Sequence, residues 1–140
     1  MADQQEAQKK FITRWFEEVW NQSRREAIDE MFPEDCVLHD GRAEYRGPEE
    51  FKRFYDALRE QLSDVRVTPL DTISEGDMVC MRWSSTAKQS STGKHLEVTG
   101  ISILRCKDGR LMEAWQNWDQ YGLHQQLQDT ASKSFSQAAG

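Results

Sequence analysis

The sequence contains no long run of apolar residues and no apolar stretch at its N-terminus. The first ten residues, MADQQEAQKK, lack the apolar segment that marks a secretory signal peptide. No segment approaches the roughly 20 apolar residues that a membrane-spanning helix requires. From both absences we expect neither a signal peptide nor a membrane-spanning segment.

Cysteine is scarce, because the chain has only Cys36, Cys80 and Cys106. They are odd in number, lie far apart and lack the CxxC spacing of zinc and redox sites. The sequence also has no HExxH pattern. We therefore expect buried free thiols in a reducing compartment, hence a cytoplasmic protein, and no bound metal.

Basic residues are outnumbered, with 18 Lys and Arg against 24 Asp and Glu, and the formal net charge is -6. Nucleic acids and anionic membranes recruit proteins through basic patches. An acidic, solvated surface of this kind argues against both as partners, so we expect no nucleic acid to bind.

The chain does contain enough apolar material for one core. It has 140 residues, of which 37% are hydrophobic, with five Trp and six Phe. This length suits one domain, and we expect it over residues 1–128. Residues 129–140 are rich in Ser, Gln, Ala and Gly, which predicts a flexible C-terminal tail.

The spacing of the apolar residues changes once along the chain. Up to Leu62 it is helical, and it predicts a long first helix, a short second helix that Pro33 ends, and a third that starts at Gly47-Pro48. A short strand pair lies between the second and third helices. From Asp64 onward the apolar residues alternate, which predicts about four antiparallel strands. Three helices on one face of a curved antiparallel sheet form an α+β domain, and such a sheet leaves room for a cavity.

Asp108-Gly109 is the strongest hairpin signal, and it predicts that Lys107 pairs with Arg110. In that register Ser102 lies opposite Trp115. Alternation then places Trp115, Asn117 and Asp119 on one face of the last hairpin, together with the small residues Gly100 and Ser102 of the preceding strand. The opposite face holds Thr99, Ile101, Ile103, Met112, Ala114, Gln116 and Trp118. The first face therefore leaves room for a ligand beside groups that can share a proton.

Residues 109–127, GRLMEAWQNWDQYGLHQQL, resemble the closing segment of the SnoaL-like polyketide cyclases, a family of the nuclear-transport-factor-2-like (NTF2-like) superfamily. The pattern of that segment is met by Gly109, Glu113, Trp115, Asp119, Gly122, Leu123, Gln126 and Leu127. The order of the expected elements also fits the family over about residues 11–127. The sequence departs from the family at Gly100, Ile101 and Ser102, where those cyclases place a histidine, and at Gln128, which replaces a glycine.

The resemblance implies a cone-like NTF2-like barrel with a hydrophobic pocket and a homodimer built through the sheet. It further implies that the acid at Asp119 is the general acid/base of an intramolecular aldol ring closure that uses neither a metal nor an organic cofactor.

Asp119 has two interpretations. In an apolar cavity beside Trp115 its pKa would rise, and the carboxyl would act as a base. Alternatively, it caps the turn that enters Gly122. His39 is the candidate for a second proton carrier, although a structural histidine is the competing explanation. Asn117 or His39 would steady a developing oxyanion.

The remaining candidates would line the ligand site. They are Trp15, Val19, Tyr55, Met81, Trp83, Gly100, Ser102, Trp115 and Asn117. Two functions follow: a cofactor-independent acid/base catalyst of ring closure, isomerisation or hydrolysis on a hydrophobic small molecule, or a non-catalytic module that only binds such a ligand. A third hypothesis is an interaction domain that uses the outer face around Ile101, Ile103 and Trp118, which would more simply form the homodimer.

Overall fold

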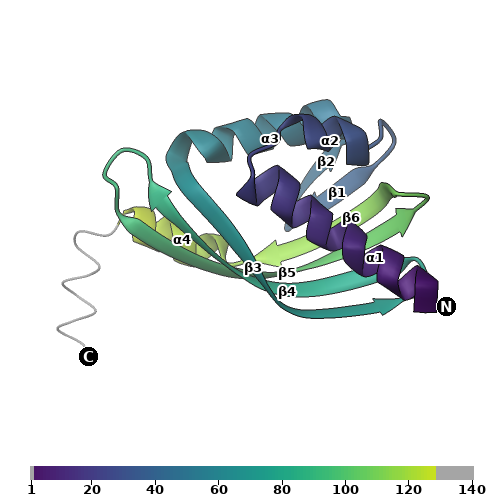
Figure 1. Ribbon diagram of the computed structural model, residues 1–140. Coiled ribbons are helices and arrows are strands. Elements are labelled where there is room, and N and C mark those ends of the chain that lie inside the picture. Colours follow the sequence, from purple (N-terminus) through teal and green to yellow (C-terminus); the bar gives the residue numbers. More distant parts are fainter. Residues whose placement is uncertain (1, 129–140) are drawn as a thin grey trace.

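The computed structural model describes residues 2–128. In it the helices that precede Leu62 lie across one face of a curved sheet (Figure 1). The helices are α1 (Ala2–Arg14), the π-helix η1 (Trp15–Asn21), α2 (Glu26–Met31), α3 (Gly47–Gln61) and α4 (Gln120–Leu127). The strands are β1 (Val37–Asp40), β2 (Ala43–Arg46), β3 (Leu62–Glu75), β4 (Met78–Gln89), β5 (His95–Lys107) and β6 (Arg110–Trp118). The predicted tail, 129–140, lies outside the described residues.

All six strands form one sheet in the order β2-β1-β6-β5-β4-β3. The short β1–β2 pair is not separate, because β1 lies parallel to β6 and extends the sheet. The other neighbouring strands are antiparallel. The predicted α+β class is therefore confirmed, and Pro69 lies on the edge strand β3 beside a register shift.

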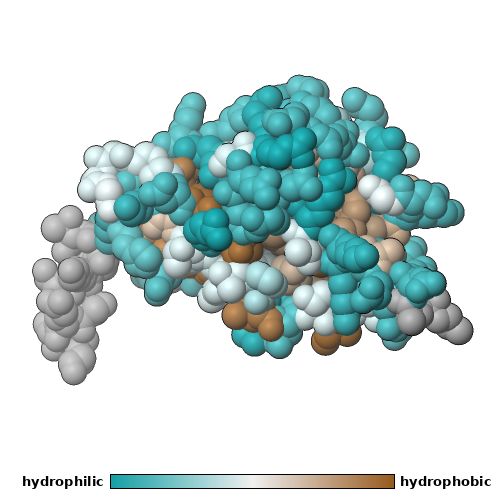
Figure 2. All heavy atoms as spheres, viewed as in Figure 1, coloured by the Kyte–Doolittle hydropathy of each residue, from teal (hydrophilic) through white to brown (hydrophobic). Residues whose placement is uncertain are grey.

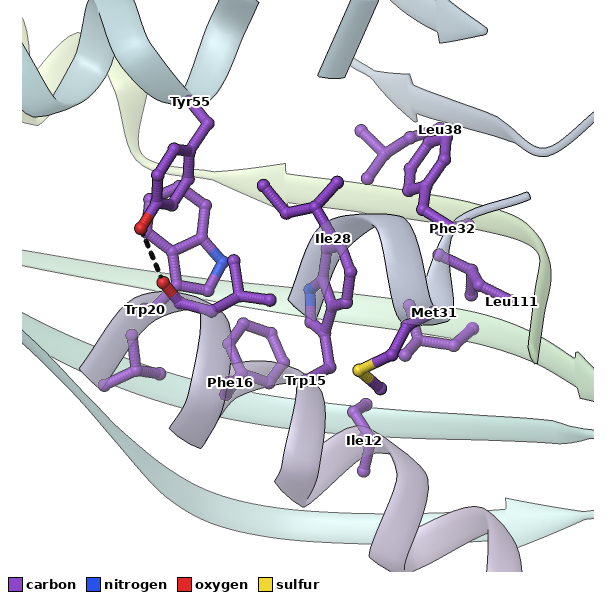
Figure 3. Packing of buried hydrophobic residues seen from close by; sticks show 14 of the residues in the cluster. Ile12, Trp15, Phe16, Trp20, Ile28, Met31, Phe32, Leu38, Tyr55 and Leu111 are labelled. Atoms are coloured by element: carbon purple, nitrogen blue, oxygen red, sulfur yellow. Dashed lines mark hydrogen bonds between the residues drawn. The ribbon is translucent and has the colours of Figure 1, made fainter. Parts of the chain in front are cut away.

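The first helix does not stay α-helical to its end. Its last seven residues form η1, in which Gln22 N–H donates to Glu17 O at 2.8 Å, five residues back. This wide turn places Trp15, Phe16, Val19 and Trp20 together in the interior. Two carbonyls at its end accept from α3: Tyr55 Oη donates to Val19 O at 2.7 Å, and Arg59 donates to Trp20 O. Figure 3 shows the first of these bonds.

The hydrophobic core lies between the helices and the inner face of the sheet, and aromatic rings form its centre (Figure 3). The ring of Phe51 on α3 lies 5.3 Å from Trp15 and 5.3 Å from Phe32, measured between centroids. Trp20 and Tyr55 are 5.0 Å apart. These contacts fix η1 against α3 and hence set one wall of the interior.

The register predicted for the last hairpin is wrong beyond its turn. Lys107 pairs with Arg110 as expected, but the pairing shifts by one residue between Cys106 and Arg105, which lies opposite Glu113. The extra residue, Met112, is a β-bulge. Ser102 therefore lies opposite Gln116 and not Trp115. Because side chains alternate, this one-residue shift exchanges the two faces of β6.

We predict that Tyr55→Phe lowers the free energy of unfolding by roughly 1–2 kcal/mol, because a buried hydrogen bond to η1 is lost. Urea denaturation measures the change. Tyr121→Phe is the matched control, since Tyr121 is 72% exposed, and its effect should stay within about 0.5 kcal/mol. Equal effects of the two substitutions would contradict the role of the Tyr55 hydroxyl.

Candidate functional site

A cavity of about 70 Å³ lies between η1, α3 and the inner face of the sheet. Its wall is predominantly apolar and rich in aromatic rings. The lining residues are Phe16, Trp20, Phe54, Leu58, Leu62, Val65, Val67, Trp83, Ser85, Thr86, Ala87, Leu96, Val98, Gln116, Trp118 and Leu123. The helices and all four long strands thus contribute to one hydrophobic space.

Asp40 is the buried carboxyl beside this cavity. Its residue is 4% exposed and ends β1, where the parallel pairing places it opposite Gln116. Three side chains donate to the carboxyl oxygens: Trp118 Nε1 at 3.0 Å, Gln116 Nε2 at 3.1 Å and Gln120 Nε2 at 2.9 Å. Two of the three donors, Gln116 and Trp118, also line the cavity. The carboxyl therefore lies directly behind the cavity wall and is oriented by it.

Burial raises the pKa of the Asp40 carboxyl above its ordinary value, although its three hydrogen bonds act in the opposite direction. The pKa of the neighbouring Tyr45 phenol is also raised, first by burial and then by the negative charge of Asp40. Tyr45 in turn stacks on the cavity residue Phe54, with 4.9 Å between ring centroids. A carboxyl with a raised pKa beside an apolar space is the arrangement that general acid/base chemistry uses.

Asp119 lies elsewhere, and of its two interpretations the structure contains the second. Its side chain accepts from Gly122 N–H at 2.9 Å and so caps α4. Asp119 is exposed, on the outer side of the sheet. The predicted placement of Trp115 and Asn117 on the inner face is wrong for the same reason, the bulge at Met112. These three residues line a shallow groove on the outer face.

His39 also points to the outer face, because it precedes the inward-facing Asp40 by one residue. Its Nε2 lies 2.7 Å from Glu113 Oε2, and its Nδ1 lies 3.4 Å from Glu44 Oε1. The ring stacks on Trp115 with 5.6 Å between centroids. The two predicted proton carriers therefore stand outside the apolar cavity.

The other predicted ligand residues divide into two groups. Trp83 lines the cavity, and Gly100 and Ser102 lie beside it on the inner face. Trp15, Val19, Tyr55 and Met81 are buried in the core, away from the cavity lining. Sequence reasoning missed Asp40, Gln116, Trp118 and Gln120. The available signal was alternation along the short first strand, which puts His39 and Asp40 on opposite faces.

Two of the three thiols, Cys36 and Cys106, are buried and not placed for chemistry. Burial raises the pKa of Cys36 and of Cys106 to about 12, which keeps both protonated at neutral pH. Within residues 2–128, no cluster of three or more His, Cys, Asp or Glu side chains has an arrangement that would hold a metal ion. No helix in the same range is long and apolar enough to cross a bilayer.

Comparison with known proteins identifies relatives of this chain. The model of the SnoaL-like polyketide cyclase family matches residues 10–127. A candidate polyketide cyclase from Acidithiobacillus ferrooxidans is 28% identical, with a TM-score of 0.78 over 89% of this chain and 96% of that one. A candidate polyketide cyclase from Bacillus cereus is 27% identical, with a TM-score of 0.73 over 84% of this chain and 78% of that one.

A third structure shares the fold alone. It is a protein from Catenulispora acidiphila with a ketosteroid isomerase-like fold, crystallised with trimethylamine, at 17% identity. Its TM-score is 0.74 over 84% of this chain and 92% of that one. A search of curated proteins found no significant match.

The raised pKa of Asp40 predicts a specific dependence of stability on pH. Above the ordinary carboxyl pKa of 3.8, the folded protein retains the Asp40 proton more strongly than the unfolded chain does. The stabilisation of the folded state by this proton is therefore fully present below that pH. It is lost as pH rises through the folded-state pKa of Asp40. We predict that the free energy of unfolding of wild type minus that of Asp40→Asn falls as pH rises from about 3 to 7. Urea unfolding of both proteins measures it. A difference that is constant or rises with pH would contradict the raised pKa.

Proposed function

The chain belongs to the SnoaL-like polyketide cyclase family, and from this premise we propose that it is a cofactor-independent acid/base catalyst acting on a hydrophobic small molecule. The proton carrier in this proposal is Asp40. The reaction class is proton transfer at carbon next to a carbonyl, as in an aldol-type ring closure or an isomerisation.

The burial of Asp40 behind the cavity wall is the observation that carries this proposal. A carboxyl that is 4% exposed and loses solvation on folding binds a proton more readily than one in water. A general base works best when its pKa approaches the working pH. Desolvation of Asp40 raises its pKa toward the working pH and so favours its action as a base.

Gln116 and Trp118 connect the carboxyl to the ligand space. Each donates one N–H to Asp40 while its side chain forms part of the cavity wall. The Gln116 amide has a second N–H and a carbonyl oxygen, and a ligand carbonyl in the cavity would meet the amide before the carboxyl. Gln116 would thus orient the ligand carbonyl so that the α-carbon faces Asp40, and the carboxylate would take the α-proton and return it to the product, which regenerates the base.

The apolar wall specifies the ligand in general terms. A cavity of about 70 Å³, lined mostly by aromatic and aliphatic side chains, favours an uncharged hydrophobic group over a polar one. The relatives from Acidithiobacillus ferrooxidans and Bacillus cereus are candidate polyketide cyclases, which supports a carbonyl-bearing ligand. A cavity of this size would hold one part of such a molecule.

The same small, apolar cavity favours a second candidate, a module that binds a hydrophobic ligand without converting it. Catalysis and binding differ in what Asp40 does, because a binding module needs its hydrogen bonds but not its proton. A substitution that preserves the shape of Asp40 and removes its acidity therefore separates the two.

We predict that Asp40→Asn lowers catalysed proton exchange by about 10²-fold or more. Small ketones, 2-butanone and cyclopentanone, serve as probes, and deuterium incorporation at their α-carbons in D₂O is followed by NMR. The Asn side chain retains one oxygen acceptor, and the Gln116 amide can turn to face its nitrogen, so the fold should persist. Asp119→Asn is the control, because Asn also caps helices and should leave exchange unchanged.

Retained exchange in Asp40→Asn would exclude Asp40 as the proton carrier, and loss of exchange in Asp119→Asn alone would transfer that role to Asp119. If wild type binds the ketones without exchanging their protons, the binding module is the correct alternative.

The outer face of the sheet supports a second proposal, a homodimer. Figure 2 shows a hydrophilic surface interrupted by apolar patches. On the sheet the exposed apolar residues include Ile101, 46% exposed, and Ile73, 70% exposed, together with Leu70 and Met112. Burial of these side chains against a second copy would remove them from water.

We predict that the protein is dimeric in multi-angle light scattering at micromolar concentrations, and that Ile101→Asp makes it monomeric. A charge at an exposed position leaves the fold intact but opposes burial in an interface. Tyr121→Asp, a change at an exposed residue of α4, should remain dimeric. A monomeric wild type would overturn the proposal.

A further inference from the structure

Trp83, Gly100 and Trp118 form one row across the sheet. Trp83 on β4 pairs with Gly100 on β5, which pairs with Trp118 on β6. A Cβ atom at position 100 would lie 2.4 Å from the Trp83 ring and 2.8 Å from the Trp118 Cβ. The indole of Trp83 thus rests directly on the backbone of β5, in space that any other residue at position 100 would fill.

The Trp83 indole is held in this position on two further sides. Its Nε1 donates to Ser102 Oγ at 3.0 Å, and Ser102 is 2% exposed. The ring of Phe16 on η1 lies 6.0 Å away between centroids. One orientation of the Trp83 side chain is therefore selected by its contacts with Gly100, the Ser102 hydroxyl and the Phe16 ring.

The indole therefore occupies volume that is continuous with the cavity, because Trp83 and Phe16 both line it. The cavity that remains, about 70 Å³, is well below the roughly 300–1,000 Å³ that small-molecule sites commonly have. Trp83 is one of the largest side chains that line this cavity.

We propose that Trp83 determines the size of ligand that the cavity accepts, by filling a second compartment over Gly100 whose polar contact is the Ser102 hydroxyl. Removal of the indole opens a compartment for a flat bicyclic ring that carries one N–H or O–H donor. The proposal rests on the proposed function only in assigning the cavity to ligand binding, and it is independent of Asp40 chemistry.

The test is the binding of indole to Trp83→Ala, measured by isothermal titration calorimetry. An apolar cavity of roughly 150 Å³ is known to stay dry and to bind benzene, and a vacated indole site adds a volume of that order. We expect indole to bind Trp83→Ala and to raise its Tm, and to do neither with wild type.

A second ligand identifies the contact with Ser102. Benzofuran has the shape of indole but no N–H. Trp83→Ala should therefore bind indole about fivefold more tightly than benzofuran, the factor that one hydrogen bond contributes. The preference should vanish in Trp83→Ala/Ser102→Ala. Trp15→Ala is the matched control, because Trp15 is 2% exposed but lies outside the cavity lining, and its void should show no preference for indole.

Absence of indole binding to folded Trp83→Ala would overturn the proposal, as would a preference for indole that persists without Ser102. If Trp83→Ala does not fold, Trp83→Leu opens a smaller space, and pyrrole against furan replaces the first pair of ligands with the same expected order. The ketone assay measures exchange by wild type and the indole assay measures binding to Trp83→Ala, so failure of the one and failure of the other are distinguishable.

Discussion

The hydrogen bonds that converge on the Asp40 carboxyl are the interaction on which the rest of the site depends. They join the end of β1 to Gln116 and Trp118 of β6 and to Gln120 at the start of α4. The parallel contact between β1 and β6 makes this possible, since it places Asp40 beside Gln116. The same contact adds β1 and β2 to the sheet, so the acid reaches the cavity wall through one pairing of strands.

Features with local signals were predictable from the sequence. The third helix begins at Gly47-Pro48 with Glu49 and Glu50 in its first turn, and Asp108-Gly109 forms the expected hairpin. The family was recognisable from residues 109–127, and the α+β architecture follows from the change of period near Leu62. Each of these depends on residues that are close together in the chain.

The inner surface of the site was not predictable, because it depends on one residue and on one distant contact. The bulge at Met112 has no marker such as Gly or Pro, yet it exchanges the faces of β6 and brings Gln116 and Trp118 inside. Asp40 precedes Gly41, a pair typical of a turn, and its partners lie 76 to 80 residues away in the sequence. Binary alternation alone cannot reveal a pairing between β1 and β6.

The π-helical turn of η1 has a consequence for how chain length relates to the shape of the interior. A π-turn contains one residue more than an α-turn, so η1 is equivalent to an α-helix that has accepted an insertion. Deletion of the extra residue would restore α-helical geometry. It would turn the Trp20 side chain to another position on the cavity wall, while the sheet remained unchanged. Relatives that differ by a single residue in this helix would therefore present different side chains to otherwise identical strands.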